Sequence, residues 1–367
     1  MIKNQTFSVC IFCFLGIIYG MKNILLAGGG TAGHIIPHIA LMPILEKNYD
    51  NVYYVGSGKD IEKQLMNDTC AVTFTVDAPA FIRSFSPRNL TIPIKLFKAI
   101  KQCEKIIKQT KPNVIFSKGG YCALPVCIAG FNLGVPVICH ESDLTLGLAN
   151  KITRFKAKAL LTTFKETAQK YENGVFVGPP VRQEFFNKSK SECRKLLGIT
   201  DQKPIVLITG GSQGSKVIND ALSKNLPAIL KKFNVIHLHG KNNKPLNSAI
   251  NGYYPFAFAD MPTVMSACDI CVSRGGSNTL FELLSTNTPT LIIPLKKGSR
   301  GDQIKNAKYF CDKGALLCAD EDELDKKLPE LINELYSKRF LLKRNTSNLR
   351  LKEGLKHTAE ILLKYSK

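Results

Sequence analysis

The chain has 367 residues, enough for two domains of ordinary size, and its 44% apolar fraction supports well-packed cores. Its formal net charge of +21, from 50 lysines and arginines against 29 aspartates and glutamates, suits nucleic acid or an anionic membrane surface. The sequence has no zinc-ligand spacing, RNA-binding aromatic motif or arginine-rich arm, so a membrane surface, or a plain lysine bias, is favoured over nucleic acid. The 12 cysteines lie mostly in apolar runs, which is typical of buried, reduced thiols in a cytosolic protein.

The first twenty residues are set apart from the predicted fold. Residues 7–19 are apolar but shorter than the roughly 20 residues of a membrane span. They resemble the core of a signal peptide, although Ile18-Tyr19-Gly20 is a poor cleavage site. Because a clean strand follows Met21 directly, we interpret Met21 as the true start, with a short hydrophobic anchor in residues 1–20 as the alternative.

A glycine turn opens the fold. Residues 23–27 are typical of a buried parallel strand, Gly28–His34 matches G-x-G-x-x-G, and a helix is expected to begin near Pro37. A dinucleotide site would also need an acid about 20 positions on, at the end of the second strand. That strand, residues 52–55, is followed by Gly56-Ser57-Gly58 with no acid, which argues against a dehydrogenase. His34, at the tip of the turn, is a candidate general base.

Strands and helices then alternate. Apolar runs at residues 72–76, 114–116, 135–139 and 159–161 are separated by helical patterns, which predicts a doubly wound parallel sheet. Three of the connecting segments carry unusual residues, and because they follow strand ends we expect them to line the same crevice as His34, with solvated loops as the alternative. These segments are Ala78–Arg88, Ser117–Tyr121 and His140–Asp143.

A second α/β unit repeats this scheme after the hinge-like Gly178–Arg182. A strand at residues 205–209 enters the glycine turn Gly210–Ser215. We therefore predict two doubly wound α/β domains at 21–180 and 181–345, with a C-terminal helix at 346–367 that could pack back on the first domain. Further elements are expected as strands at 235–238, 256–258 and 289–294, a helix at 261–267, and a charged helical tail at 324–364.

The most informative stretch is Ser273–Glu282. A strand at residues 270–272, two glycines and a helix follow one another, so Ser277, Asn278 and Thr279 fall at a helix start, where free N–H groups and the helix dipole favour a phosphate. Glu282, one turn further on, could accept hydrogen bonds from two ribose hydroxyls. An anion site beside a hydroxyl acceptor suits a nucleotide-sugar donor, and the alternative is an ordinary capped helix. Asp302 and Gln303, at the next helix start, are expected beside the same site.

These motifs together resemble the MurG family, the membrane-associated N-acetylglucosaminyltransferases of bacterial peptidoglycan synthesis. The likeness covers residues 21 to about 350. It implies a glycosyltransferase-B fold, with two Rossmann-like domains facing across a cleft, and transfer of GlcNAc from UDP-GlcNAc to the C4 hydroxyl of MurNAc in lipid I. The product would be lipid II, made by a peripheral protein on the cytoplasmic face of the cell membrane. The motifs are Gly28–His34, Lys118–Tyr121, His140–Asp143, Gly178–Arg182, Gly210–Gly214 and Arg274–Glu282 with Gln303.

The resemblance also implies roles for single residues. His34 would be the general base or position the acceptor hydroxyl, with Glu141 as a second catalytic candidate. Family members often have Gly at Ala32 and Asn at Asp143, which weakens the assignment of Asp143 to the donor sugar. The UDP-GlcNAc contacts would be Thr31, Ala32, Gly33, Asp143, Arg182, Ser212, Phe258, Ser277, Asn278, Thr279, Glu282 and Gln303.

Cofactor and partners follow from the same reasoning. Because a helix N-terminus can take the charge of departing UDP, no essential metal is expected. Loop residues Phe81, Ile82, Arg83, Phe85 and Arg88 could dock on anionic lipid, or simply pack on their own domain. Other cell-wall synthesis and division proteins are further candidate partners. Two rival functions remain: a UDP-GlcNAc 2-epimerase on the same fold, and a non-catalytic nucleotide-binding scaffold.

Overall fold

The computed structural model describes residues 21–80, 91–211, 213–241, 243–246, 250–296, 300–351 and 353–367. The expectations for residues 1–20, for the lipid-docking residues between 81 and 88, and for Ser212 lie outside these ranges. The chain forms two compact units. The first holds the described residues up to Glu141, together with Leu146–Phe176 and Lys356–Lys367. The second holds Ser142–Thr145 and Val177–Leu355.

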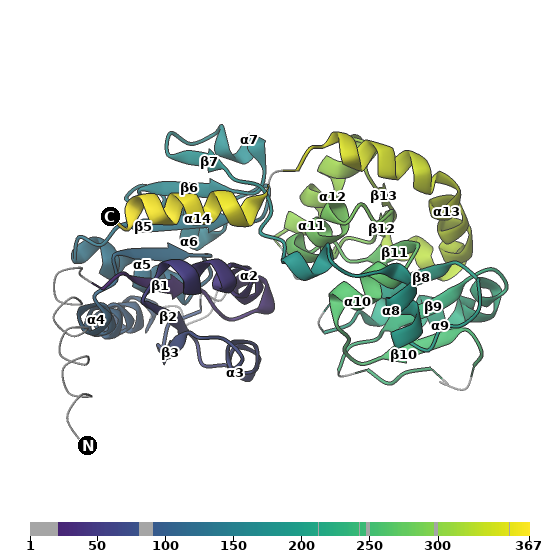
Figure 1. Ribbon diagram of the computed structural model, residues 1–367, viewed down its shortest axis with the longest axis horizontal. Coiled ribbons are helices and arrows are strands. Elements are labelled where there is room, and N and C mark those ends of the chain that lie inside the picture. The colour runs from purple at the N-terminus through teal and green to yellow at the C-terminus, as the bar shows by residue number, and fades with distance from the viewer. Residues whose placement is uncertain are drawn as a thin grey trace, which may run out of the picture. The chain divides into compact units, whose positions relative to one another are not determined.

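The first unit is built on a seven-stranded parallel sheet in the order β3-β2-β1-β4-β5-β6-β7, with helices on both faces (Figure 1). Every residue of β1, β4, β5 and β6 is buried, as expected for parallel strands covered on both sides. The strands are β1 (Asn23–Ala27), β2 (Asn51–Gly56), β3 (Val72–Thr75), β4 (Val114–Ser117), β5 (Val137–Glu141), β6 (Ala159–Thr162) and β7 (Gly174–Phe176). The helices are α2 (Ala32–Asn48), α3 (Asp60–Met66), α4 (Ile92–Thr110), α5 (Ala123–Asn132), α6 (Leu148–Thr153), α7 (Lys165–Ala168) and α14 (Gly354–Tyr365).

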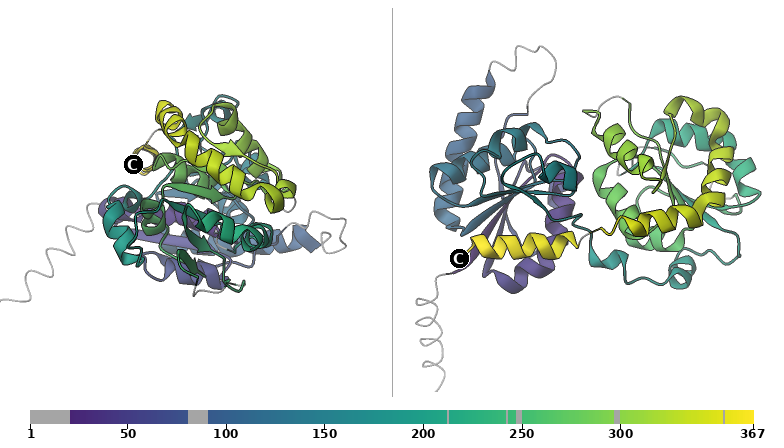
Figure 2. Two further views of the ribbon diagram at one scale, coloured as in Figure 1. Left: turned by 90° about the vertical axis from the view of Figure 1, so that its right-hand side faces the viewer. Right: turned by 90° about the horizontal axis from the view of Figure 1, so that it is seen from above.

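The two faces of this sheet pack differently. On one face, Leu25 and Ile115 meet α4 and α5 in a purely apolar cluster. On the other face, α2 places His38 against the rings of Tyr54 and Phe116. The strand order reverses at β1 and β4, and such a reversal is where ligands bind in open α/β sheets. The C-terminal helix α14 lies along this unit (Figure 2), where Tyr49 and Ser366 share a 2.6 Å hydrogen bond.

The second unit has a six-stranded parallel sheet in the order β10-β9-β8-β11-β12-β13, with its own reversal at β8 and β11. The strands are β8 (Ile205–Thr209), β9 (Asn234–Leu238), β10 (Tyr253–Phe256), β11 (Ile270–Ser273), β12 (Thr290–Ile292) and β13 (Leu317–Cys318). The α-helices are α8 (Lys190–Leu196), α9 (Lys216–Leu230), α10 (Met261–Ala267), α11 (Ser277–Ser285), α12 (Asp302–Asp312) and α13 (Leu324–Asn348), with short 3-10 turns η2 (Gln183–Phe185) and η3 (Glu321–Glu323).

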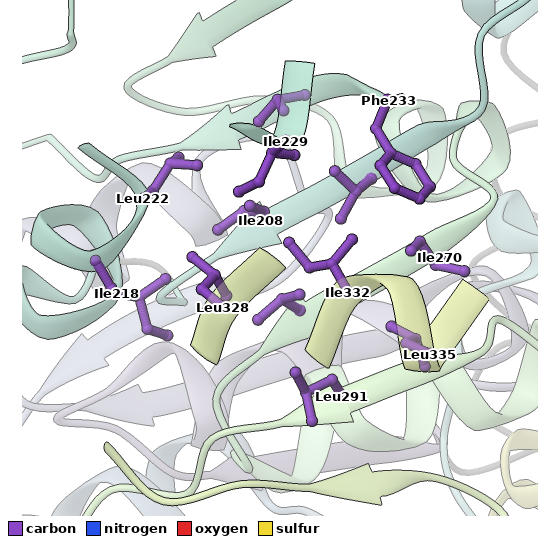
Figure 3. Packing of buried hydrophobic residues seen from close by; sticks show 14 of the residues in the cluster. Ile208, Ile218, Leu222, Ile229, Phe233, Ile270, Leu291, Leu328, Ile332 and Leu335 are labelled. Atoms are coloured by element: carbon purple, nitrogen blue, oxygen red, sulfur yellow. The ribbon is translucent and has the colours of Figure 1, made fainter. Parts of the chain in front are cut away.

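The core of the second unit forms where α13 and α9 cover one face of its sheet. Leu328 and Ile332 of α13 pack over Ile208 and Leu291 of the strands (Figure 3). Leu328 and Ile332 are four positions apart and therefore lie on one face of α13. This explains why the charged C-terminal segment still buries an apolar stripe. The fold class predicted from the alternating pattern is confirmed in both units.

Several predicted boundaries were wrong. The first helix begins at Ala32, not near Pro37, because Thr31 already serves as the N-cap and the helix holds Pro37 and Pro43 within it. His34 therefore lies in the first turn of α2 and not at the tip of a loop. Strand β10 covers Tyr253–Phe256, so Phe258 follows it, and the C-terminal helix begins at Gly354 because α13 continues to Asn348.

Two further observations bear on the composition. The ten cysteines within the described ranges are all free thiols, and seven of them are buried, as the sequence predicted. In the part of the chain that the structure describes, no helix is both long enough and apolar enough to span a membrane.

Candidate active-site residues

The glycine turn after β1 needs glycine for steric reasons. Gly29 and Gly30 have φ angles of 138° and 87°, which side chains rarely adopt. A Cβ on Gly30 would lie 2.6 Å from the ring of Tyr121, and one on Gly28 would lie 2.9 Å from His38. The turn is therefore pressed closely against its neighbours.

His34 lies at the start of α2, half-buried. Its Nδ1 is 3.1 Å from the Thr31 hydroxyl, and Cε1 would be 3.2 Å from a Cβ on Gly120. The loops after β1 and β4 thus meet at this imidazole, as the strand reversal predicted. The Thr31 hydroxyl thus contacts Nδ1 of His34. A contact of this kind fixes which of the two ring nitrogens carries the proton. Ala32 is half-buried and Gly33 exposed beside it, and a Cβ at Gly33 would have room.

Glu62 is an important residue that sequence reasoning missed. Its carboxylate is 3% exposed and accepts hydrogen bonds from the backbone N–H groups of Gly30 (2.5 Å), Ser57 (2.7 Å) and Gly58 (3.1 Å), and from the Ser57 hydroxyl. An acid does follow the second strand, but it binds protein amides. The available clue was its place at the third position of a helix after Gly-Ser-Gly, where Glu commonly reaches back to free N–H groups.

A buried cation lies behind the second glycine loop. Lys118 is 4% exposed, and its Nζ is 2.6 Å from Nδ1 of His140. Burial, followed by the Lys118 charge, keeps the pKa of His140 well below its ordinary value and lowers the pKa of His38 to about 3. Both imidazoles are therefore neutral at pH 7, and the Lys118 ammonium can donate to His140. Sequence reasoning included Lys118 in a motif without giving it a role.

Glu141 was predicted to follow its strand, but it is the last residue of β5. The carboxylate is 7% exposed and accepts hydrogen bonds from the Gly147 N–H (2.8 Å) and the Asn150 side chain (3.0 Å). The Asn150 amide also donates to the His140 carbonyl oxygen. Glu141 thus organises the start of α6, and its assignment as a catalytic residue stays a prediction.

In the second unit, the turn between β11 and α11 has space around its helix N-terminus. A Cβ on Gly276, the N-cap of α11, would meet no heavy atom within 4 Å, whereas Gly275 is backed by Gln303. Ser277, Asn278 and Thr279 are half-buried, and the first turn of α11 carries no acid. A helix N-terminus with open space beside it can bind an anion.

Glu282 is buried inside this turn of α11, only 7% exposed, and no hydrogen bond reaches its carboxylate from the described residues. Burial raises its pKa to about 7, and the charge of Arg182 opposes the rise. Arg182 lies with its guanidinium carbon 5.1 Å from the centre of the Phe185 ring, and its buried Nε lacks a hydrogen-bond partner within the described ranges. The Glu282 carboxylate and the Arg182 guanidinium therefore lie near each other, and both have hydrogen-bonding atoms left for a ligand.

Arg274 links the two glycine turns of the second unit. Its guanidinium is 9% exposed, forms an ion pair with Glu321, and donates to the Ser215 hydroxyl (2.5 Å) and the Ile293 carbonyl (3.2 Å). Ser215 is itself the N-cap of α9, where it accepts from the Ile218 N–H. Arg274 therefore has a structural role at the point where the strand order reverses.

Asp143, in the segment predicted to line one crevice with His34, groups with the second unit as part of Ser142–Thr145. Asn306, fully buried in α12, donates to Asp143 (2.9 Å) and accepts from the Leu144 N–H (3.0 Å). Burial, then the Asp302 charge, raises the pKa of Asp143, although Asn306 and Ser277 hydrogen bonds oppose this. Asp143 thus lies among residues at the starts of α11 and α12.

Two further predicted donor contacts belong to the second unit. Gln303, near the start of α12, accepts a hydrogen bond from the Leu295 N–H at 3.1 Å. Phe258 is 65% exposed, with the Lys241 ammonium 5.8 Å from its ring centre, so a flat partner could cover it. Among the described residues, no group of three or more His, Cys, Asp or Glu side chains is arranged to hold a metal ion.

Comparison with known proteins now places the chain. Residues 24–162 match the glycosyltransferase family 28 N-terminal domain, and residues 205–360 match the C-terminal domain of that family. The chain belongs to glycosyltransferase family 28. A relative from Clostridium botulinum, named UDP-N-acetylglucosamine–N-acetylmuramyl-(pentapeptide) pyrophosphoryl-undecaprenol N-acetylglucosamine transferase, is 42% identical over 354 residues, covering 95% of this chain and all of the relative.

Solved structures show the same fold. The crystal structure of MurG from Acinetobacter baumannii matches with a TM-score of 0.70 and 23% identity, over 94% of this chain and 99% of the other. The UDP-GlcNAc 2-epimerase of Neisseria meningitidis, bound to UDP-GlcNAc, matches with a TM-score of 0.61 and 14% identity, over 94% and 99%. The resemblance to the MurG family and the glycosyltransferase-B fold of this family 28 member are thus confirmed, and the chain is a glycosyltransferase.

Proposed function

We propose that this family 28 enzyme transfers GlcNAc from UDP-GlcNAc to the C4 hydroxyl of MurNAc in lipid I, with inversion, to give lipid II. The observation that supports this most is the β11–α11 turn, with a space beside the helix N-terminus and a buried carboxylate one turn inside. The diphosphate would bind the N–H groups of Ser277–Thr279, and Glu282 would accept from the ribose hydroxyls. Arg182 and Gln303 would contact the donor, and Phe258 would cover the uracil.

His34 is the proposed base on the acceptor side. It would take the proton of the C4 hydroxyl while that oxygen bonds to C1 of GlcNAc and the bond from C1 to UDP breaks. The charge that develops on UDP would be stabilised by the N-terminus of α11, without an essential metal. The experiment is a transfer assay with labelled UDP-GlcNAc and a lipid I analogue, with and without chelator. Label in the lipid fraction despite chelator supports the proposal.

The epimerase alternative makes a different prediction in the same assay. The solved epimerase shares the fold, at 14% identity, so the fold alone does not separate the two activities. An epimerase would convert UDP-GlcNAc to another sugar nucleotide without any lipid acceptor. Conversion of the donor without transfer would therefore overturn the transferase proposal, and binding without either reaction would favour a scaffold.

A peripheral position on the cytoplasmic face of the membrane fits the exposed side chains of the first unit. Ile94 and Phe97 of α4 are 64% and 61% exposed on a helix with five lysines and one glutamate. Ile152 and Phe155, in and beside α6, are also exposed, and both α4 and α6 pack on α5 and so share one face of the sheet. Apolar side chains among lysines suit an anionic lipid surface.

This surface can be tested with vesicles. The full chain should sediment with anionic vesicles and much less with neutral ones, and Phe97→Glu should weaken that binding. Equal binding to both vesicle types would contradict the membrane proposal. Association with other cell-wall synthesis and division proteins stays a prediction.

A further inference from the structure

The outer edge of the first sheet carries a groove that the proposed site does not use. Strand β3 is the edge strand, and α3 lies near it but packs mainly on α2 (Figure 1). Between α3 and the strands β2 and β3 is a cavity of about 460 Å³, within the range of small-ligand sites.

The floor of this groove is polar where a helix–sheet interface would normally be apolar. Tyr54 pairs with Thr73 in the β2–β3 register, so Tyr54, Thr73 and Thr75 share the face that α3 covers. Thr73 and Thr75 are exposed, and the buried Tyr54 hydroxyl has no hydrogen-bond partner among the described residues. Lys63 of α3 adds a cation to the wall. Hydroxyls and an ammonium group beside a cavity suit a polar, anionic ligand.

The shape of the groove favours an extended chain. It runs from Gly58, in the loop after β2, and Thr75, at the carboxyl end of β3, to Thr69 and Ala71, which precede β3. A four-residue strand is about 13 Å long, which matches about four residues of extended peptide.

One end of the groove opens at the proposed catalytic edge. Glu62 lines the groove, and its carboxylate binds both the Gly58 N–H and the Gly30 N–H. Gly30 belongs to the turn that leads into α2, and His34 lies in the first turn of that helix. Four N–H and O–H donors already bind the Glu62 carboxylate and offset much of its negative charge. An anionic ligand in the groove is therefore repelled less by this carboxylate.

The chemistry of the acceptor matches this position. In a muramyl sugar the peptide is attached through the lactyl ether at C3, next to the C4 hydroxyl that would receive GlcNAc. A site for the peptide must therefore begin beside the base that acts on C4. We propose that the groove between α3 and β3 binds the peptide stem of the acceptor, which rests on the proposed function and adds a specificity site to it.

The experiment compares two acceptor analogues, one with a pentapeptide on the lactyl carboxyl group and one capped there as a methyl amide. Thr73→Trp fills the groove from an exposed strand position, and Lys63→Ala removes its cation. Both should raise KM for the pentapeptide analogue, by about tenfold for Thr73→Trp and about threefold for Lys63→Ala, and leave KM for the capped analogue and the donor unchanged. Val72→Trp, which adds the same bulk to the opposite face of β3, is the matched control and should change neither.

The outcomes separate this inference from the proposed function. Wild-type transfer with equal KM changes for both analogues, or with none, would overturn the peptide groove and leave the transferase intact. If wild type transfers nothing, binding of the free pentapeptide, followed by calorimetry in wild type and Thr73→Trp, still tests the groove. Binding that Thr73→Trp abolishes would support it, and equal or absent binding would refute it.

Discussion

The turn between β1 and α2 in the first unit and the turn between β11 and α11 in the second both join a buried parallel strand to a helix through consecutive glycines. In the first, the carboxylate of Glu62 binds the Gly30 N–H and neighbouring rings press on the glycines. In the second, the helix N-terminus at Gly276 has space beside it. The same local sequence scheme thus gives one turn whose Gly30 amide binds the Glu62 carboxylate and one that has open space beside Gly276.

This difference assigns the two turns different tasks in the proposed reaction. A turn held rigidly by its own protein can position a base, and here it leads into α2, whose first turn carries His34. An open helix N-terminus can bind and release a diphosphate. A glycine motif by itself therefore does not indicate a phosphate site, because the occupant of its N–H groups decides its use.

The largest effect is expected for His34→Ala, which removes the proposed base from the rigid turn. Turnover should fall by about 10²–10⁴-fold, while the Kd for UDP stays unchanged because the UDP contacts proposed above lie in the second unit. Transfer kinetics and calorimetry check this. His357→Ala, at another half-buried histidine, is the control and should keep its turnover. A parallel loss of UDP affinity would make His34 a donor ligand instead.

A matched pair of glycine substitutions tests the comparison directly. Gly30→Ala should lower the free energy of unfolding by about 2–4 kcal/mol, because φ is 87° and the new Cβ would lie 2.6 Å from Tyr121. Gly276→Ala, at φ −65° with open space, should change stability by less than about 0.5 kcal/mol yet weaken UDP binding. Urea unfolding and calorimetry give both values. Similar stability losses at the two sites would remove the distinction drawn here.

Glu62→Gln should destabilise the first unit by about 1–3 kcal/mol, because an amide cannot accept all the hydrogen bonds of the carboxylate and places an N–H group against backbone donors. Turnover should fall as the His34 turn loosens, with UDP affinity unchanged. Asp60→Asn, at an exposed carboxylate on the same helix, is the control. Full activity in Glu62→Gln would show that the turn holds its shape without this carboxylate.

The last comparison concerns the pH dependence at Glu282. Its pKa of about 7 in the folded chain exceeds the ordinary 4.5, so the folded state binds the proton more tightly. The stability contributed by this group is present below pH 4.5 and is lost as pH rises through 7, by about 3 kcal/mol at most. Glu282→Gln should therefore be more stable than wild type at pH 8 and equal to it at pH 4.

Ligand binding should show the opposite trend with pH. The ionised Glu282 carboxylate is the better acceptor for ribose hydroxyls, so UDP affinity in wild type should fall by up to about tenfold per pH unit below 7. Glu282→Gln should bind weakly and without this slope. Titration calorimetry at several pH values decides the point, and an unchanged affinity in the variant would exclude Glu282 from the donor site.

The sequence by itself determined the fold class, the two-unit plan, most strands and the proposed donor helix. Buried parallel strands are continuous apolar runs, and turns with positive φ need glycine, so both are local patterns. His34 and Glu282 could be chosen as candidate site residues because each lies a fixed number of residues after a glycine turn. The early start of α2 was missed because Pro37 can sit either at a helix start or further inside it.

Only the tertiary structure decided which partners the charged side chains contact. Glu62 reaches Gly30 from 32 positions away, Arg274 reaches Glu321 from 47, and Asp143 reaches Asn306 from 163. No local pattern encodes such distances, since sheet order and helix packing bring the groups together. The groove beside β3 has the same origin, because two threonines on an edge strand become a binding floor only when a helix lies near them without closing over them.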